Sequence, residues 1–181
     1  MGSNAAGIEP PVRVVIETEF GSIAVEVDSA RAPITAANFL RYVDGGYYAS
    51  GRFHRTVTPE NQPNDRIRIE VIQGGIAPER ADEAGPPIPL ERTTVTGLRH
   101  LDGTISMARF APDSAVSDIF ICIGDQPELD FGGQRNPDGQ GFAAFGKVAK
   151  GLEIVKKIQQ SPAEAQKLVP PILIKQALRL P

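Results

Sequence analysis

Tryptophan is absent from the 181-residue sequence, and only one cysteine and two histidines are present. The single thiol, Cys122, cannot form an intramolecular disulfide, and with His54 and His100 it cannot complete a Cys/His structural zinc site. Cys122 lies in the apolar run Ile119–Ile123, where a buried structural thiol is expected rather than a nucleophile. These shortages argue against redox chemistry and against a metal centre.

Long apolar runs and an excess of positive charge are also missing. No apolar run approaches the 18 or so residues of a membrane-spanning helix, so no membrane span is expected. Nineteen Lys and Arg against 22 Asp and Glu give a net charge of −3, which disfavours nucleic acid as a partner. Apolar residues at 41% and charged residues at 23% are ordinary globular values and exclude a wholly disordered chain.

Glycine and proline, by contrast, are abundant, with 18 and 16 residues, which favours many turns over long helices. We expect residues 12–181 to form one domain, a monomer, behind a disordered tail or tag of residues 1–11. The opening Met1–Ala6 is typical of an expression tag, and a removed leader would make the periplasm the expected compartment, with the cytoplasm as the alternative.

Hydrophobic patterning predicts eight strands and two main helices. The helices are expected from Pro33 to Gly45 and from Gly151 to Gln160, because apolar residues recur there at helical spacing. Eight strands with two helices favour a mainly β protein, a closed eight-stranded antiparallel barrel capped by the helices, over a doubly wound sheet. The expected strands are Val12–Thr18, Ser22–Val27, Arg52–Val57, Arg66–Gln73, Gly103–Met107, Asp118–Ile123, Gly141–Val148 and Pro171–Leu178.

One motif suggests nucleotide binding and fails on inspection. The segment Gly141–Lys147 satisfies the G-x-x-x-x-G-K part of a phosphate-binding loop. The next residue is Val148, where magnesium binding needs Ser or Thr, and the intervening residues are apolar with strand character. We therefore interpret the segment as a strand, and a null nucleotide titration would remove the alternative.

A set of short phrases carries the strongest signal, because their order along the chain is specific. Together they resemble the cyclophilin family of peptidyl-prolyl cis-trans isomerases, with a likeness from about Val12 to Leu178. The phrases are Ala32-Pro33, Asn38-Phe39, Phe53-His54-Arg55, Val71–Gly75, Gly103–Ala108, Ser117–Ile121 and Phe145–Val148.

The resemblance implies an eight-stranded antiparallel barrel and rotation about X–Pro bonds in exposed or unfolded segments, assisting folding without a cofactor. It assigns catalysis to Arg55 and Gln73: the guanidinium donates to the imide nitrogen, and the glutamine contacts the substrate backbone and orients the arginine. It places substrate-binding residues at Val71, Ala108, Phe120, Leu129 and Phe142, and at the same surface we expect Glu70 and Asp118 to contact substrate, which makes nine site residues with the catalytic pair. Strand alternation predicts that His54, beside Arg55, points to the opposite face and has a structural role.

The sequence also departs from the family pattern. Glu70 and Val71 stand where many members have Phe-Met, so one wall of the proline socket is expected to become a carboxylate near Arg55 and the other to shrink. Arg109 and Asp118 replace uncharged residues and predict a more charged groove. Glu128 replaces a tryptophan, which predicts weak cyclosporin binding.

These changes leave a second hypothesis open. Arg55 and Gln73 favour an isomerase of bacterial type, whereas Glu70, Asp118 and Glu128 favour a catalytically weak module or chaperone that binds proline-containing peptides on the same fold. Two insertions, Thr58–Arg68 and Phe131–Gln140, are expected to lengthen loops around the groove without breaking the site.

Overall fold

The structure, a computed structural model, describes residues 9–181, so most of the predicted N-terminal tail lies outside the described residues. The strands are β1 (Val12–Thr18), β2 (Gly21–Val27), β3 (Arg52–Val57), β4 (Val71–Gly75), β5 (Thr104–Met107), β6 (Ile119–Cys122), β7 (Ala143–Lys150), β8 (Ala163–Glu164) and β9 (Lys167–Arg179). The helices are α1 (Pro33–Asp44), α2 (Thr93–Thr96) and α3 (Leu152–Gln159), with short 3-10 turns at Pro59–Asn61, Pro78–Glu83 and Pro127–Leu129.

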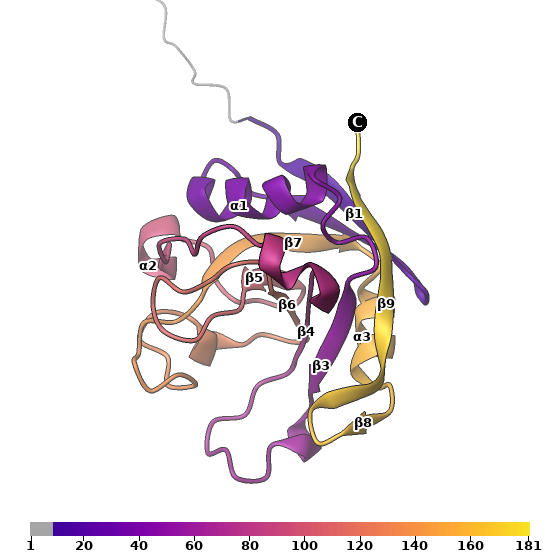
Figure 1. Cartoon of the computed structure of the whole chain (residues 1–181). Coiled ribbons are helices and arrows are strands. Elements are labelled where there is room, and N and C mark those ends of the chain that lie inside the picture. The colour runs from indigo at the N-terminus through magenta and orange to yellow at the C-terminus, as the bar shows by residue number, and fades with distance from the viewer. Residues whose placement is uncertain (1–8) are drawn as a thin grey trace, which may run out of the picture.

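Eight of these strands close on themselves as an antiparallel barrel. Their order is β1-β2-β7-β5-β6-β4-β3-β9, and β9 pairs with β1 to complete the circle. The two residues of β8 pair only with the start of β9 and form a hairpin below the barrel (Figure 1). The predicted fold class is therefore confirmed.

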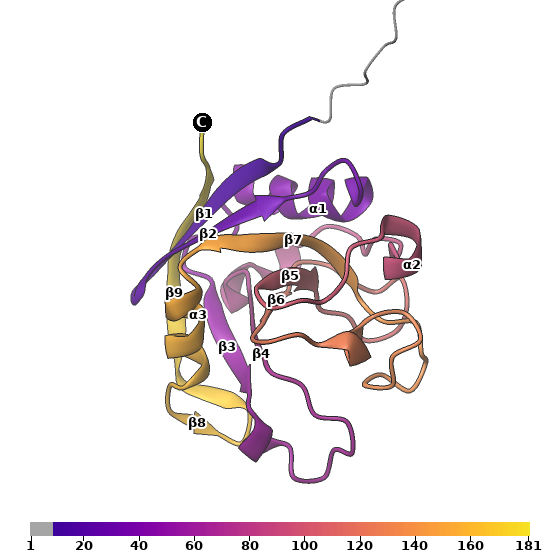
Figure 2. The ribbon, with the colours of Figure 1, turned by 180° about the vertical axis from the view of Figure 1, so that it is seen from behind.

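The two main helices lie where the patterning predicted them, one above the barrel and one along its side (Figures 1 and 2). α1 begins with proline, whose missing N–H costs nothing in a first turn, and it buries Ala36, Phe39, Leu40 and Val43. α3 buries Val155 and Ile158 on one face. The single-turn α2 was not predicted, because four residues are too few to show a helical period.

Strand alternation divides the apolar residues between two clusters. Ile119 and Ile121 of β6 belong to the main core inside the barrel, together with Phe39, Phe53 and Phe145. Phe120 and Cys122 alternate with them and face outward. They join a smaller cluster with Val57, Ile69, Val71 and Leu129. Cys122 is buried, and burial raises the pKa of its thiol. The thiol therefore stays protonated, which fits a structural role. No helix within residues 9–181 is long and apolar enough to cross a membrane.

The segment before β4 differs from the prediction. A strand was expected from Arg66, whereas β4 begins at Val71 and the preceding residues form an irregular loop. Strand pairing stops at Val71, and the side chain of Gln62 bonds to the backbone of this loop instead. Its Oε1 accepts from the Ile69 N–H at 3.2 Å, and its Nε2 donates to the Thr58 carbonyl at 2.9 Å. The long β3–β4 loop (Figure 1) contributes Ile69 to the outer cluster.

Candidate active site

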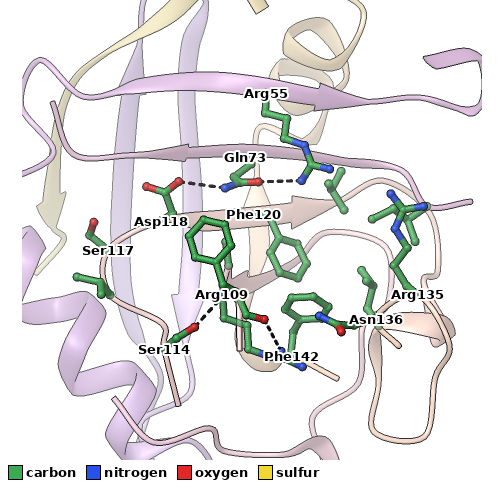
Figure 3. A pocket seen from close by; sticks show the side chains of 16 residues that line it. Arg55, Gln73, Arg109, Ser114, Ser117, Asp118, Phe120, Arg135, Asn136 and Phe142 are labelled. Atoms are coloured by element: carbon green, nitrogen blue, oxygen red, sulfur yellow. Dashed lines mark hydrogen bonds between the residues drawn. The ribbon is translucent and has the colours of Figure 1, made fainter. Parts of the chain in front are cut away.

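Three neighbouring strands place three predicted site residues in one row. Arg55 of β3 is opposite Gln73 of β4, and Gln73 is opposite Phe120 of β6. Residues paired across strands share a face of the sheet, so all three side chains point out of the barrel toward the same pocket (Figure 3). The register of the sheet therefore assembles the site.

The pocket over this row has a volume of about 500 Å³, within the usual range for ligand sites. It lies on the outer face of the barrel, and the loops that precede β4, β6 and β7 contribute to its lining. Of the nine predicted site residues, eight line it: Arg55, Val71, Gln73, Ala108, Asp118, Phe120, Leu129 and Phe142.

A chain of hydrogen bonds fixes the polar side of the pocket. Arg55 Nη1 donates to Gln73 Oε1 at 3.0 Å, and Gln73 Nε2 donates to Asp118 Oδ2 at 3.0 Å. Gly75 lets Asp118 approach, because a Cβ on that glycine would collide with the carboxylate. Asp118 therefore fixes the amide of Gln73 with its oxygen toward the guanidinium.

His54 joins this chain, contrary to the expectation from alternation. The β3–β4 pairing opposes Phe53 to Gly74 and Arg55 to Gln73, so His54 is the extra residue of a bulge. An extra residue resets the two-residue period, and His54 and Arg55 both lie outside the barrel. His54 Nε2 lies 3.0 Å from Asp118 Oδ2, at the end of the hydrogen-bonded chain Arg55–Gln73–Asp118.

Burial changes the electrostatics of Arg55. Partial removal from water lowers the pKa of its guanidinium, the charge of Arg135 lowers it further, and Asp65 raises it. An arginine remains protonated at neutral pH even so. The pocket thus holds a half-buried cation, whose field is stronger than it would be in bulk solvent.

Gln166 also contacts Arg55, and no sequence motif marks it. Its Oε1 accepts hydrogen bonds from Arg55 Nε at 3.0 Å and Nη2 at 2.7 Å. The residue lies in the turn between β8 and β9, 111 positions away in the chain. Only the tertiary fold brings the two residues together, so the local sequence pattern could not predict this contact.

Aromatic and aliphatic side chains form the apolar side of the pocket. The rings of Phe120 and Phe142 meet edge to face with centroids 5.4 Å apart. Behind Phe120, the His100 ring stacks at 5.7 Å, almost parallel. Leu129 and Val71 are both buried and belong to the same cluster. The result is a concave apolar socket beside the guanidinium, with Phe142 in the wall as predicted.

Glu70 does not contribute to this socket, and the predicted carboxylate wall was wrong. Its Oε1 instead accepts a hydrogen bond from Gln159 Nε2 of α3 at 3.1 Å. Ile69 takes the wall position and lines the pocket, although the sequence comparison missed it. Ile69, Val71 and Gln73 lie two residues apart and share a face, whereas Glu70 faces the other way with Ile72.

Arg109 does not place a free charge in the groove either. Its side chain is 1% exposed and pairs with Asp138 through Nη1 at 2.8 Å and Nη2 at 3.0 Å. Nε donates to the Gly141 carbonyl at 2.9 Å, and the guanidinium lies over the Phe142 ring at 4.7 Å. Arg109 therefore lines the pocket beside Phe142 and supports that ring, while its charge is compensated by Asp138.

Arg135 joins the two inserted loops at the edge of the pocket. Its Nη1 donates to Gln62 Oε1 at 2.9 Å and to the Ile67 carbonyl at 2.6 Å, and it lies 3.4 Å from Asp65. The insertions were expected to leave the site intact, and their junction keeps Ile69 in the wall. Glu128 stays within its loop, where its carboxylate accepts the Gln134 N–H.

An Asp-His-Ser arrangement lies beneath Phe120. His100 Nδ1 is 2.7 Å from Asp130 Oδ1, and Nε2 is 2.9 Å from Ser106 Oγ. This is the connectivity of a serine hydrolase triad, but His100 and Ser106 are buried and no substrate can reach them. The network holds the His100 ring against Phe120, so its role is structural.

This network predicts an acid sensitivity. Burial works to raise the pKa of Asp130, but hydrogen bonds from the His100 ring and backbone and the charge of Arg99 lower it below its usual value. A depressed carboxyl pKa stabilises the fold above the unfolded pKa of about 4, and this stability is lost as pH falls through the lower folded pKa. Urea unfolding of Asp130→Asn should therefore show a shallower fall in unfolding free energy below about pH 4 than wild type.

The exposed Asp82 supplies the matched control for that measurement. Asp82→Asn should keep the wild-type dependence of unfolding free energy on acid pH, because that dependence, and not the absolute stability, reports the half-buried Asp130 carboxylate. Equal slopes for Asp130→Asn and wild type would contradict the assignment.

Comparisons with known proteins agree with this geometry. The family model for "Cyclophilin type peptidyl-prolyl cis-trans isomerase/CLD" matches residues 13–178. The chain is 38% identical over 152 residues to peptidyl-prolyl cis-trans isomerase A of Dickeya dadantii, covering 83% of this chain and 73% of that one. It is 32% identical over 147 residues to peptidyl-prolyl cis-trans isomerase B of Escherichia coli K12, covering 81% and 83%.

A solved structure shows the same fold. The cyclophilin-type isomerase of Cryptosporidium parvum, crystallised in the presence of the dipeptide Ala-Pro, superimposes with a TM-score of 0.74 at 24% identity. The match covers 93% of this chain and 99% of that one. The closed antiparallel barrel is thus the fold of cyclophilin-type isomerases. The chain belongs to the cyclophilin-type peptidyl-prolyl cis-trans isomerase family, and its reaction is rotation about X–Pro peptide bonds.

Proposed function

We propose that this pocket binds a proline-containing peptide with the proline ring against Phe120 and the imide nitrogen within reach of Arg55. The observation that carries the proposal is the alignment of Arg55, Gln73 and Phe120 on three paired strands around one pocket. The apolar walls match the ring, and the guanidinium and amide match the peptide groups beside it. The related protein crystallised with Ala-Pro supports the ligand class.

Catalysis in this proposal is electrostatic. Amide resonance keeps the X–Pro bond planar behind a barrier of about 18–20 kcal/mol. A hydrogen bond from Arg55 to the imide nitrogen favours the twisted form, in which the lone pair is localised, over either planar ground state. A 10⁵-fold acceleration corresponds to about 7 kcal/mol of such selective stabilisation. Gln73, which Asp118 orients, binds the substrate backbone and steadies the guanidinium.

Peptide NMR tests both the activity and its site. Cis-trans exchange rates are measured on X–Pro tetrapeptides with wild type and Arg55→Ala, and matched X–Ala peptides control for nonspecific contact. Wild type should accelerate exchange, and Arg55→Ala should do so at least about a hundredfold less. Binding without acceleration by wild type would instead support a proline-peptide-binding module on this fold. Equal acceleration by both proteins would remove Arg55 from the mechanism.

A further inference from the structure

Gln166 holds an edge of the Arg55 guanidinium that Gln73 leaves free. The Gln166 Oε1 accepts from both Nε and Nη2, while Gln73 Oε1 accepts from Nη1, so two amides engage all three nitrogens. A planar guanidinium has donors in a fixed fork, and acceptors on two of its edges fix both its position and its plane. Gln166 therefore restrains the orientation of Arg55.

Hydrogen bonds also fix the backbone around Gln166. Lys167, the next residue, pairs with Arg55 in the β3–β9 ladder, which places the β8–β9 turn beside the guanidinium. The Gln166 carbonyl accepts the Thr56 N–H at 2.9 Å, and its Nε2 donates to the Asn61 carbonyl at 3.3 Å. Asn61 Nδ2 in turn donates to the Ala165 carbonyl at 3.2 Å. These contacts direct the Gln166 oxygen toward Arg55.

The position and charge of Gln166 suit a residue that supports Arg55 and does not itself bind substrate. It does not line the pocket, so it reaches a substrate only through Arg55. As a neutral acceptor it orients the guanidinium without cancelling its charge, which a carboxylate would do. Within residues 9–181, these bonds engage three of the five guanidinium N–H groups and leave one on each Nη for the substrate.

We propose that Gln166 is a positioning residue that preorganises Arg55 for proline isomerisation. The proposal rests on the proposed role of Arg55. Preorganised donors need no rearrangement when the transition state forms, whereas a mobile arginine must first be ordered. Loss of Gln166 should therefore lower kcat more than it raises KM.

The first test is Gln166→Met, which keeps the length of the side chain and removes both amide groups. We expect kcat for an X–Pro peptide to fall about tenfold with KM within about twofold of wild type. NMR of the Arg55 Nε–H supplies a measurement independent of activity. Its exchange with water should become several-fold faster, because Gln166 is the acceptor of that hydrogen.

Two further variants keep the test decisive. Glu164→Gln, an exposed change in the same hairpin, is the matched control and should leave kcat and Nε–H exchange unchanged. Asn61→Ala keeps Gln166 but removes the contact of Asn61 with the turn, so both quantities should move in the same direction as in Gln166→Met, by a smaller amount.

The outcomes separate this proposal from the proposed function. If Arg55→Ala loses two to three orders of magnitude in kcat/KM while Gln166→Met keeps wild-type kcat and Nε–H exchange, positioning by Gln166 is overturned and the role of Arg55 stands. If Arg55→Ala retains wild-type rates, the proposed catalytic role fails first. A tenfold loss of kcat accompanied by faster Nε–H exchange supports Gln166 as the residue that positions Arg55.

Discussion

Replacing Arg55 by alanine is expected to lower kcat/KM for an X–Pro peptide by two to three orders of magnitude, about the loss caused elsewhere by removing one preorganised transition-state donor. The apolar socket stays in place, so peptide binding should weaken much less than turnover. Arg55 is half-buried, and water can reach the amides of Gln73 and Gln166 that it leaves behind. The unfolding free energy should therefore change by only about 1 kcal/mol.

Arg55→Lys separates charge from geometry. A lysine keeps the positive charge but lacks the planar fork that engages Gln73 and Gln166 together, so it cannot hold the same orientation. We expect its kcat/KM to stay at least tenfold below wild type in the peptide exchange assay. Full activity of the lysine variant would mean that charge alone suffices and that the two amides are dispensable.

The barrel could be predicted because it depends on local pattern, and the site residues Arg55, Gln73 and Phe120 because the sequence resembles the cyclophilin family. Alternating apolar residues gave the strands, and the pairing of Arg55, Gln73 and Phe120 follows once those strands are adjacent. Strand alternation gave the wrong orientation for His54. A bulge adds one residue to one strand, and counting by twos then assigns the wrong face.

Ile69 and Glu70 show a different limit. Position-by-position comparison with the family put a carboxylate in the wall, although two-residue alternation back from Gln73 already pointed to Ile69. Long-range partners were beyond any local pattern. Gln166 reaches Arg55 across 111 positions, and Arg109 meets Asp138 across 29, so the charge expected in the groove is paired.

Arg109→Ala is expected to lower the unfolding free energy by about 2–4 kcal/mol, because the Arg109 side chain is 1% exposed and holds several hydrogen bonds, although its partner Asp138 is 28% exposed. The change leaves the Asp138 carboxylate and the Gly141 carbonyl without their shared donor and removes the cation that lies over Phe142. For a protein of this size, the loss corresponds to a fall in Tm of roughly 5–15 °C. Urea and thermal unfolding measure both quantities.

Arg99→Ala provides the matched comparison, because Arg99 is 72% exposed and lies 3.8 Å from its partner Asp130. An exposed pair contributes little, so that variant should stay within about 0.5–1 kcal/mol of wild type. Arg109 holds the pKa of Asp138 below its usual value, so Arg109→Ala should also raise the Asp138 pKa in an NMR titration. Equal stability of the two arginine variants would show that the Arg109–Asp138 pair does not support the Phe142 wall. A large loss confined to Arg109→Ala, with reduced kcat/KM, would show that the socket depends on a charge pair beside it.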